Sequence, residues 1–282
     1  MNKDITVILL AHKSENLVMK FIKDIYNKFQ IIIIDNSNDL NLKKKIEKFY
    51  PNINFKMVKN DGYGSAINYA STFVKTEYFL ISNPDVEGLT ETNINEFYKS
   101  AKILKDKFSS LGPRFINANP KSHVQSDESI EIADMKFISG ACMFFKTETF
   151  KSLKGFDENF FLYFEESDFC LRSYKINKNY QINRIRINHY VGTSVNTKNE
   201  NEKKLLEKLY TWHFIWSKYY YYKKNYGIIY SIIYFIPTLL RTLFRILFYT
   251  LTKNFEKQEK FINRFDGLIT SMKGLKSYKR LK

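Results

Sequence analysis

Two short polar clusters in this chain carry side chains that could do chemistry, and the first is Asn83-Pro84-Asp85. It follows an apolar run and ends on a carboxylate, which can hold a divalent cation such as Mg²⁺ or Mn²⁺. The cation can bridge a diphosphate and offset the charge that develops on a leaving group. Asn-Pro-Asp is also good turn chemistry, so a simple turn is the alternative interpretation.

The second cluster is acidic and follows an aromatic stretch that ends at Phe164. It contains Glu165, Glu166 and Asp168. Apolar surroundings raise the proton affinity of a carboxylate, which suits it to act as a general base. The alternative interpretation is an acidic first turn of a helix, which the helix macrodipole favours.

Two further features could bind ligands. The turn Gly62-Tyr63-Gly64 precedes a helical pattern, so its backbone N–H groups could bind a phosphate or a sugar. It lacks the full spacing of a dinucleotide fingerprint or a P-loop. His189 could be a third metal ligand, although a lone histidine is more often a hydrogen-bonded surface or core residue.

Strands and helices that alternate along the chain must position these residues. Short apolar runs predict strands, and helical spacing follows each of the first three, so we expect a doubly wound, mainly parallel α/β sheet. The predicted strands are Ile5–Leu10, Ile31–Ile34, Phe55–Val58 and Tyr78–Ile81, and the predicted helices are Ser14–Phe29, Leu40–Tyr50 and one from Ser65. Ligands of such sheets bind beyond the carboxyl ends of the strands, where Ala11-His12, Asp35–Asp39 and Asn83–Asp85 lie. A strand over Phe137–Phe145 and a helix over Glu165–Asn177 are expected further along.

Six blocks in this order resemble the family 2 glycosyltransferases, most closely their rhamnosyltransferase and galactofuranosyltransferase-like branch. The blocks are Asp35-Asn36-Ser37, Asn60 to Asn68, Ser82 to Val86, Gly140 to Met143, Gly155 to Arg172, and His189 to Ser194. The resemblance covers about Ile5 to Ser194. It implies a GT-A fold, in which a nucleotide-binding α/β sheet joins an acceptor-binding half. It also implies transfer of a sugar from a nucleotide diphosphate donor with inversion, with dTDP-rhamnose as the first expected donor and UDP-linked hexose or galactofuranose as the second.

The resemblance also implies residue roles. Asp35 matches the acid that grips the base or ribose, Asp85 matches the last position of the Asp-x-Asp metal motif, and Glu166 matches the acid that deprotonates the acceptor hydroxyl. His189 matches a histidine that completes the metal site in some relatives. The remaining expected donor-site residues are Ala11, His12, Asn60, Gly62, Tyr63, Gly64, Asn68 and Asn83, with Gly140, Ala141 and Cys142 on the acceptor side and Glu165 beside the base.

Two positions depart from the family pattern. The first metal-motif position is Asn83 instead of Asp, so the ion has one anionic ligand fewer. The base position is Glu166 where Asp is more usual, which makes Asp168 a rival base.

The charge of the chain is concentrated near its C-terminus. The formal net charge is +16, and from Lys203 onward 17 Lys and Arg stand against four acids. Such a basic region attracts phosphates of lipids or nucleic acids. Two cysteines give no disulfide framework, and the run Ile5–Leu10 lacks the length and cleavage site of a signal peptide, so we expect a reduced, cytoplasmic location.

The segment Tyr226–Leu251 is strongly apolar and flanked by lysines. Only fifteen uncharged residues precede Arg241, fewer than the ~20 that a spanning helix needs, and Pro237 would kink or end a helix. We therefore expect an interfacial or re-entrant helix on an anionic membrane, peripheral or monotopic at the cytoplasmic face of the inner or plasma membrane. A buried helix or an oligomer contact is the alternative.

These patterns predict a glycosyltransferase domain over residues 1–200 and a basic, apolar helical region over residues 201–282. The expected acceptor is a saccharide, with a polyprenyl-diphosphate carrier suggested by the apolar region. A non-catalytic sugar-nucleotide-binding or scaffold module of the same fold is the first alternative. A nucleic-acid-binding protein is the second, but the charge lies beside an apolar run instead of alternating with aromatic residues in a groove.

Overall fold

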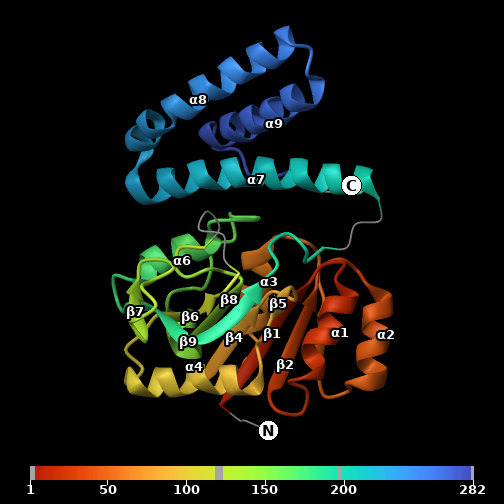
Figure 1. Ribbon diagram of the computed structural model, residues 1–282, viewed down its shortest axis with the longest axis vertical. Helices are drawn as coiled ribbons and strands as arrows, with labels where there is room; N and C mark the ends of the chain where they lie inside the picture. The colour runs from red at the N-terminus through yellow and green to blue at the C-terminus, as the bar shows by residue number, and fades with distance from the viewer. Residues whose placement is uncertain (1–3, 118–122, 196–198, 281–282) are drawn as a thin grey trace. The chain divides into compact units, whose positions relative to one another are not determined.

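The computed structural model describes residues 4–117, 123–195 and 199–280 (Figure 1). The chain divides into two compact units. The first comprises Met1–Asp157 and Phe169–Asn196, and the second comprises Glu158–Asp168 and Thr197–Lys282. The expected division at residue 200 therefore differs in one respect, because the acidic segment groups with the C-terminal helices.

The first unit is built on one mixed sheet with the strand order β3-β2-β1-β4-β8-β6-β9-β5. The strands are β1 (Ile5–Ala11), β2 (Gln30–Asp35), β3 (Asn54–Met57), β4 (Tyr78–Ser82), β5 (Val86–Glu87), β6 (Ser110–Phe115), β7 (Ile132–Met135), β8 (Cys142–Lys146) and β9 (Asn179–His189). The first four strands pair in parallel. The prediction of a mainly parallel sheet is wrong beyond β4, where β8 pairs antiparallel with both β4 and β6 and only β6 with β9 is parallel.

Helices cover both faces of this sheet because its central strands are apolar on both sides. Val7 and Leu9 of β1 belong to one core and Ile8 belongs to the other, as the alternation of side chains along a strand requires. One face packs on α1 (Glu15–Lys23), α2 (Leu40–Phe49) and α4 (Glu91–Ile103). The other packs on α3 (Tyr63–Ser71), α5 (Thr147–Ser152) and the end of α6 (Glu165–Ser173).

Several predicted elements are shorter in the structure. The helix expected to reach Phe29 ends at Lys23, although Ile25 and Phe29 are still buried from the turns that follow. The helical spacing therefore continues past the end of the helix. The strand expected over Phe137–Phe145 begins only at Cys142, and α6 ends at Ser173.

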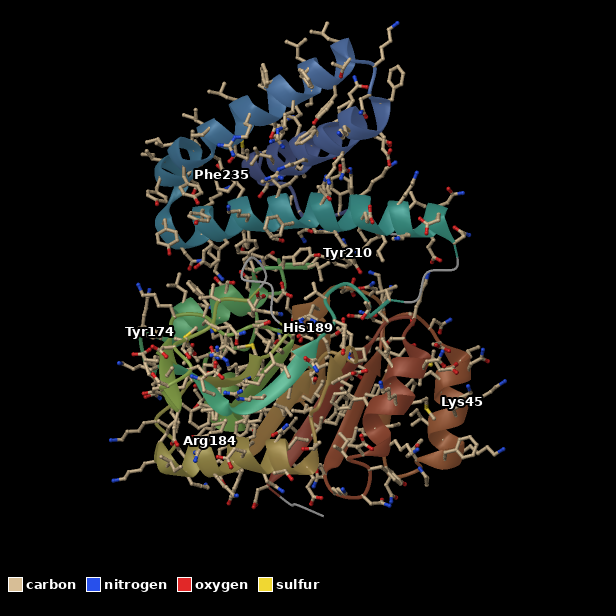
Figure 2. The ribbon with its side chains drawn as sticks, viewed as in Figure 1. Lys45, Tyr174, Arg184, His189, Tyr210 and Phe235 are labelled. Carbon is tan, nitrogen blue, oxygen red and sulfur yellow. The ribbon has the colours of Figure 1, made fainter. Side chains whose placement is uncertain are left out.

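The second unit contains three long helices, α7 (Glu200–Tyr226), α8 (Ile228–Leu251) and α9 (Phe255–Met272), with α9 between the other two (Figure 1). Their core consists of Ile215, Tyr219, Phe235 and Leu268 (Phe235 is labelled in Figure 2). Gly267 allows the close approach of α7 and α9, because a Cβ there would lie 2.8 Å from the Trp212 carbonyl oxygen. Pro237 does not end α8. The helix loses one backbone hydrogen-bond donor there, and packing of the helix residues before and after Pro237 offsets this loss.

Candidate active site

The end of β4 and the end of β9 bring Asp85 beside His189. Asn83, Pro84 and Asp85 do form a turn, in which the Asn83 carbonyl oxygen accepts a hydrogen bond from the Val86 N–H at 3.3 Å. Val86 then pairs with His189 in the antiparallel β5–β9 ladder (His189 is labelled in Figure 2). The turn and the ligand site are therefore the same structure, and Asp85 is only 1% exposed.

The geometry of this pair fits a divalent cation. Asp85 Oδ1 is buried and has no hydrogen-bond partner in the described part of the chain, and it lies 3.4 Å from His189 Nε2. Asp85 Oδ2 accepts a hydrogen bond from Ser194 Oγ at 2.5 Å. Two ligand atoms that each lie about 2.1 Å from one ion are roughly 3 Å apart, so this spacing suits shared coordination.

The protein supplies few ligands to such an ion. Within residues 4–117, 123–195 and 199–280, no group of three or more His, Cys, Asp and Glu side chains is placed to hold a metal. Mg²⁺ is commonly held by one or two carboxylates together with waters and substrate phosphates. Asp85 and His189 therefore fit a cation that a diphosphate completes.

A second histidine, His123, orients His189. His123 Nε2 lies 2.9 Å from His189 Nδ1, and the His123 ring stacks on Phe115 at 4.4 Å. Burial, with a smaller contribution from His189, lowers the pKa of His123 to about 4, so His123 is neutral at neutral pH. When His189 Nδ1 donates in this hydrogen bond, His189 Nε2 keeps its lone pair on the side of Asp85.

Asn117 fixes the backbone at the same point. Its side chain accepts a hydrogen bond from the His189 N–H at 2.9 Å and donates one to the His189 carbonyl oxygen at 3.1 Å. Neither His123 nor Asn117 could be singled out from the sequence. They lie in irregular segments far from His189 in the sequence, where no spacing indicates a contact.

The predicted nucleotide-binding acid, Asp35, folds the loop that follows β2. It is fully buried, and its Oδ1 accepts hydrogen bonds from Ser37 N–H at 3.1 Å and Ser37 Oγ at 2.6 Å. Its Oδ2 accepts a hydrogen bond from the Asp39 N–H at 2.7 Å. These hydrogen bonds give the Asp35 carboxylate a structural role, so its contact with a nucleotide stays a prediction.

The same strand ends hold a row of polar side chains, of which His12 and Asn60 are partly exposed and Asn36 is buried. Ala11 pairs with Asp35 in the sheet, which places His12 beside the β2 loop. His12 Nδ1 lies 2.7 Å from Asn36 Oδ1, and Asn36 Nδ2 donates to Asn60 Oδ1 at 3.2 Å. These amide and imidazole groups are available to a base or ribose.

The glycine turn begins α3 as expected. Gly62 is the N-cap residue with φ 111°, a conformation that favours glycine, and no side chain caps the helix. The Tyr63 hydroxyl donates to the Gly140 carbonyl oxygen at 2.7 Å, which joins this turn to the segment before β8.

Two residues predicted to bind ligands also have structural roles, and a ligand contact of the partly exposed Asn68 stays a prediction. The Asn68 side chain donates to the Phe156 carbonyl oxygen and accepts from the Phe156 N–H, both at 2.9 Å, so it holds the loop at Gly155. Cys142 is fully buried in β8, so it is not accessible to an acceptor. Ala141 before the strand is also buried, whereas Gly140 is partly exposed.

The acidic segment belongs to the second unit, where α7 holds it. Ser217 of α7 donates to the Leu162 carbonyl oxygen at 2.8 Å. Tyr163 and Phe164 both have left-handed backbone conformations, with φ 69° and 71°, and their rings pack against Phe214. Strain of this kind persists only where the surroundings enforce it, and it lies directly before the predicted base.

The three acids have different environments. Both oxygens of the fully buried Asp168 lie 2.8 Å from Lys224 Nζ, and Asn225 also donates to Asp168. Burial raises the pKa of the partly exposed Glu166, and burial together with the charge of Glu166 raises the pKa of Glu165 further. Glu166 therefore ionises first, and Asp168, already ion-paired, is the weaker candidate for a base.

Comparisons with known proteins agree with this arrangement. The model of glycosyl transferase family 2 matches residues 6–178. The low-salt glycan biosynthesis hexosyltransferase Agl10 of Haloferax volcanii is 23% identical over 199 residues, which cover 62% of this chain and 63% of that protein. The rhamnosyltransferase WbbL of Escherichia coli K12 is 24% identical over 247 residues, covering 73% of this chain and 88% of that protein.

A solved structure has a similar fold. The mannosyltransferase PcManGT of Pyrobaculum calidifontis, in complex with GDP-Man and Mn²⁺, superposes with a TM-score of 0.58 at 13% identity. The similarity covers 96% of this chain and 88% of that protein. At this identity it shows the fold alone, which is the mixed α/β sheet of GT-A enzymes.

Proposed function

Because the chain belongs to glycosyl transferase family 2, we propose that it transfers a sugar, with inversion, from a nucleotide diphosphate to a hydroxyl group of a saccharide. The observation that carries this proposal is the pairing of the buried, unbonded Asp85 Oδ1 with His189 Nε2 at the end of the parallel strands. That is the edge at which α/β sheets bind phosphorylated ligands.

On the donor side, Asp85 and His189 would hold Mg²⁺ or Mn²⁺ together with the diphosphate. A bound cation supplies charge compensation to a diphosphate leaving group. His123 and Asn117 keep His189 in place, and Ser194 keeps Asp85 in place. His12, Asn36 and Asn60 would contact the nucleoside, and the uncapped N-terminus of α3 would contact phosphate or sugar.

On the acceptor side, Glu166 would remove the proton from the attacking hydroxyl group. Its raised pKa makes it a stronger base than an ordinary glutamate, and its partial exposure leaves it accessible. Burial and the charge of Glu166 raise the pKa of the neighbouring Glu165 as well. Asp168 keeps the segment on α7 through Lys224.

The donor sugar and the acceptor are the finer part of the proposal. The similarity to a rhamnosyltransferase at 24% identity supports dTDP-rhamnose as the first donor to test. Helix α8 is long and apolar enough to cross a membrane, and the mean hydropathy of its apolar window is 1.5. Only 17% of that window is buried within the protein, so most of it is exposed. We favour attachment to the cytoplasmic membrane surface and a lipid-linked acceptor, because lysines and arginines flank this exposed apolar helix.

Turnover of designed variants tests the assignment. Asp85→Ala and Glu166→Gln should each lower kcat by about 10²-fold or more, whereas the exposed Glu47→Gln on α2 should not. Asp85→Ala should also abolish Mn²⁺-dependent stabilisation by the donor in a thermal shift screen of nucleotide sugars, while Glu166→Gln should keep it. Wild-type activity in both Asp85→Ala and Glu166→Gln would refute the site.

A further inference from the structure

Three arginines gather between α8 and α9. Arg245 lies over the Phe261 ring at 4.9 Å, and Tyr249 stacks on the same ring at 5.7 Å, which fixes the register of the two antiparallel helices. Arg241 lies one turn before Arg245 on the same face of α8, and Arg264 lies one turn after Phe261 on α9. Burial, and then the charges of Arg245 and Arg241, lower the pKa of Arg264.

This cluster has no acidic partner in the described part of the chain. Helix α8 contains no Asp or Glu. The acids of α9 are Glu256, Glu259 and Asp266, and each is paired elsewhere, with Lys204 at 3.8 Å, Lys208 at 2.6 Å and Lys279 at 2.9 Å. Helix α9 thus pairs its carboxylates with lysines elsewhere, so none of them offsets the charge of the arginines.

Such an arrangement is unfavourable in the protein alone. Arg264 is partly buried whereas Arg241 and Arg245 are exposed, so the three like charges repel one another and Arg264 also loses hydration. A bound anion offsets both costs. Guanidinium groups match phosphate oxygens with paired hydrogen bonds, so several arginines together suit a phosphate better than a carboxylate.

The surface next to the cluster indicates what carries the phosphate. An apolar stripe runs along α8 beside the arginines and is open to solvent. Its members are Ile229 (73% exposed), Ile233 (62%), Leu240 (61%), Phe244 (66%), Leu247 (59%) and Leu251 (73%). A ligand that satisfies both surfaces has a phosphorylated head and a hydrocarbon chain.

We propose that Arg241, Arg245 and Arg264 bind the diphosphate group of a membrane lipid whose hydrocarbon chain lies along the exposed stripe of α8. A diphosphate carries more negative charge than the single phosphodiester of an ordinary phospholipid, so it matches three guanidinium groups better. This proposal rests on the proposed function only for the membrane location of the chain. It means that α8 and α9 bind the lipid-carrier end of a lipid-linked acceptor.

Binding of the full-length chain to vesicles tests the proposal. The probes are phosphatidylcholine vesicles that contain geranylgeranyl diphosphate, or phosphatidylglycerol at matched charge. The triple change Arg241→Gln, Arg245→Gln, Arg264→Gln should weaken binding to the diphosphate vesicles at least tenfold. The matched control, Lys253→Gln, Lys257→Gln, Lys260→Gln, removes the same charge from α9 and the turn before it and should weaken binding less than threefold.

Three results would overturn the proposal. They are equal losses in the two triple variants, equal wild-type affinity for the two vesicle types, and undiminished binding of the arginine variant. Thermal unfolding without lipid guards against misfolding, because removing unpaired like charges should hold or raise the Tm of the arginine variant. Glu166→Gln should bind vesicles like the wild type, so failure of the proposed chemistry and failure of this site are distinguishable.

Discussion

The ion pair between Lys224 and Asp168 predicts how strongly α7 stabilises the acidic segment. Asp168 is fully buried, and Lys224 Nζ lies 2.8 Å from each of its oxygens. Lys224→Met keeps most of the aliphatic stem and removes the ammonium group. Removing one partner of a buried pair costs about 3–5 kcal/mol. The Lys224 side chain is 27% exposed and Asn225 still donates to Asp168, so we expect about 2 kcal/mol.

Urea unfolding of the full-length chain, followed by circular dichroism, measures this loss. Lys223→Met is the matched control, because Lys223 forms no ion pair in the described part of the chain, and it should change stability by under ~0.5 kcal/mol. The double variant Lys224→Met, Asp168→Asn should be more stable than Lys224→Met alone, since no buried charge remains unpaired. A loss below ~0.5 kcal/mol in Lys224→Met, or no recovery in the double variant, would refute the reasoning.

Three further predictions concern the first unit and the base. Gly155→Ala should cost about 3 kcal/mol in urea unfolding, because its φ is 61° and a Cβ would lie 2.3 Å from the Asn68 amide oxygen. Gly192→Ala, with φ 83° and open space, should cost only about 1 kcal/mol, and equal losses would contradict this account. His123→Phe should weaken Mn²⁺ binding about 10–100-fold by electron paramagnetic resonance, and unchanged affinity would exclude an orienting role. Turnover should fall as pH drops through the raised pKa of Glu166, since only the carboxylate accepts a proton, and a flat acidic limb of the pH–rate profile would exclude Glu166 as base.

The parallel half of the fold could be predicted from the residue pattern alone, and the same pattern singled out most of the candidate site residues. Runs such as Ile31–Ile34 are continuous and β-branched, so they form strands buried on both faces. Polar residues at the ends of these strands must then meet at one edge of the sheet. Asp85 and Glu166 could be singled out in this way because local composition, strand ends and family resemblance all point to them.

Which of these residues lie together depends on contacts between distant parts of the chain. The β5–β9 register pairs Val86 with His189 and so brings Asp85 beside that histidine, and His123 joins them from an irregular loop. Lys224 pairs with Asp168, which leaves Glu166 as the more accessible candidate for the base. Contacts of this kind join segments far apart in the sequence, and their energy comes from burial and hydrogen bonding at one point in space. They leave no periodic pattern along the chain.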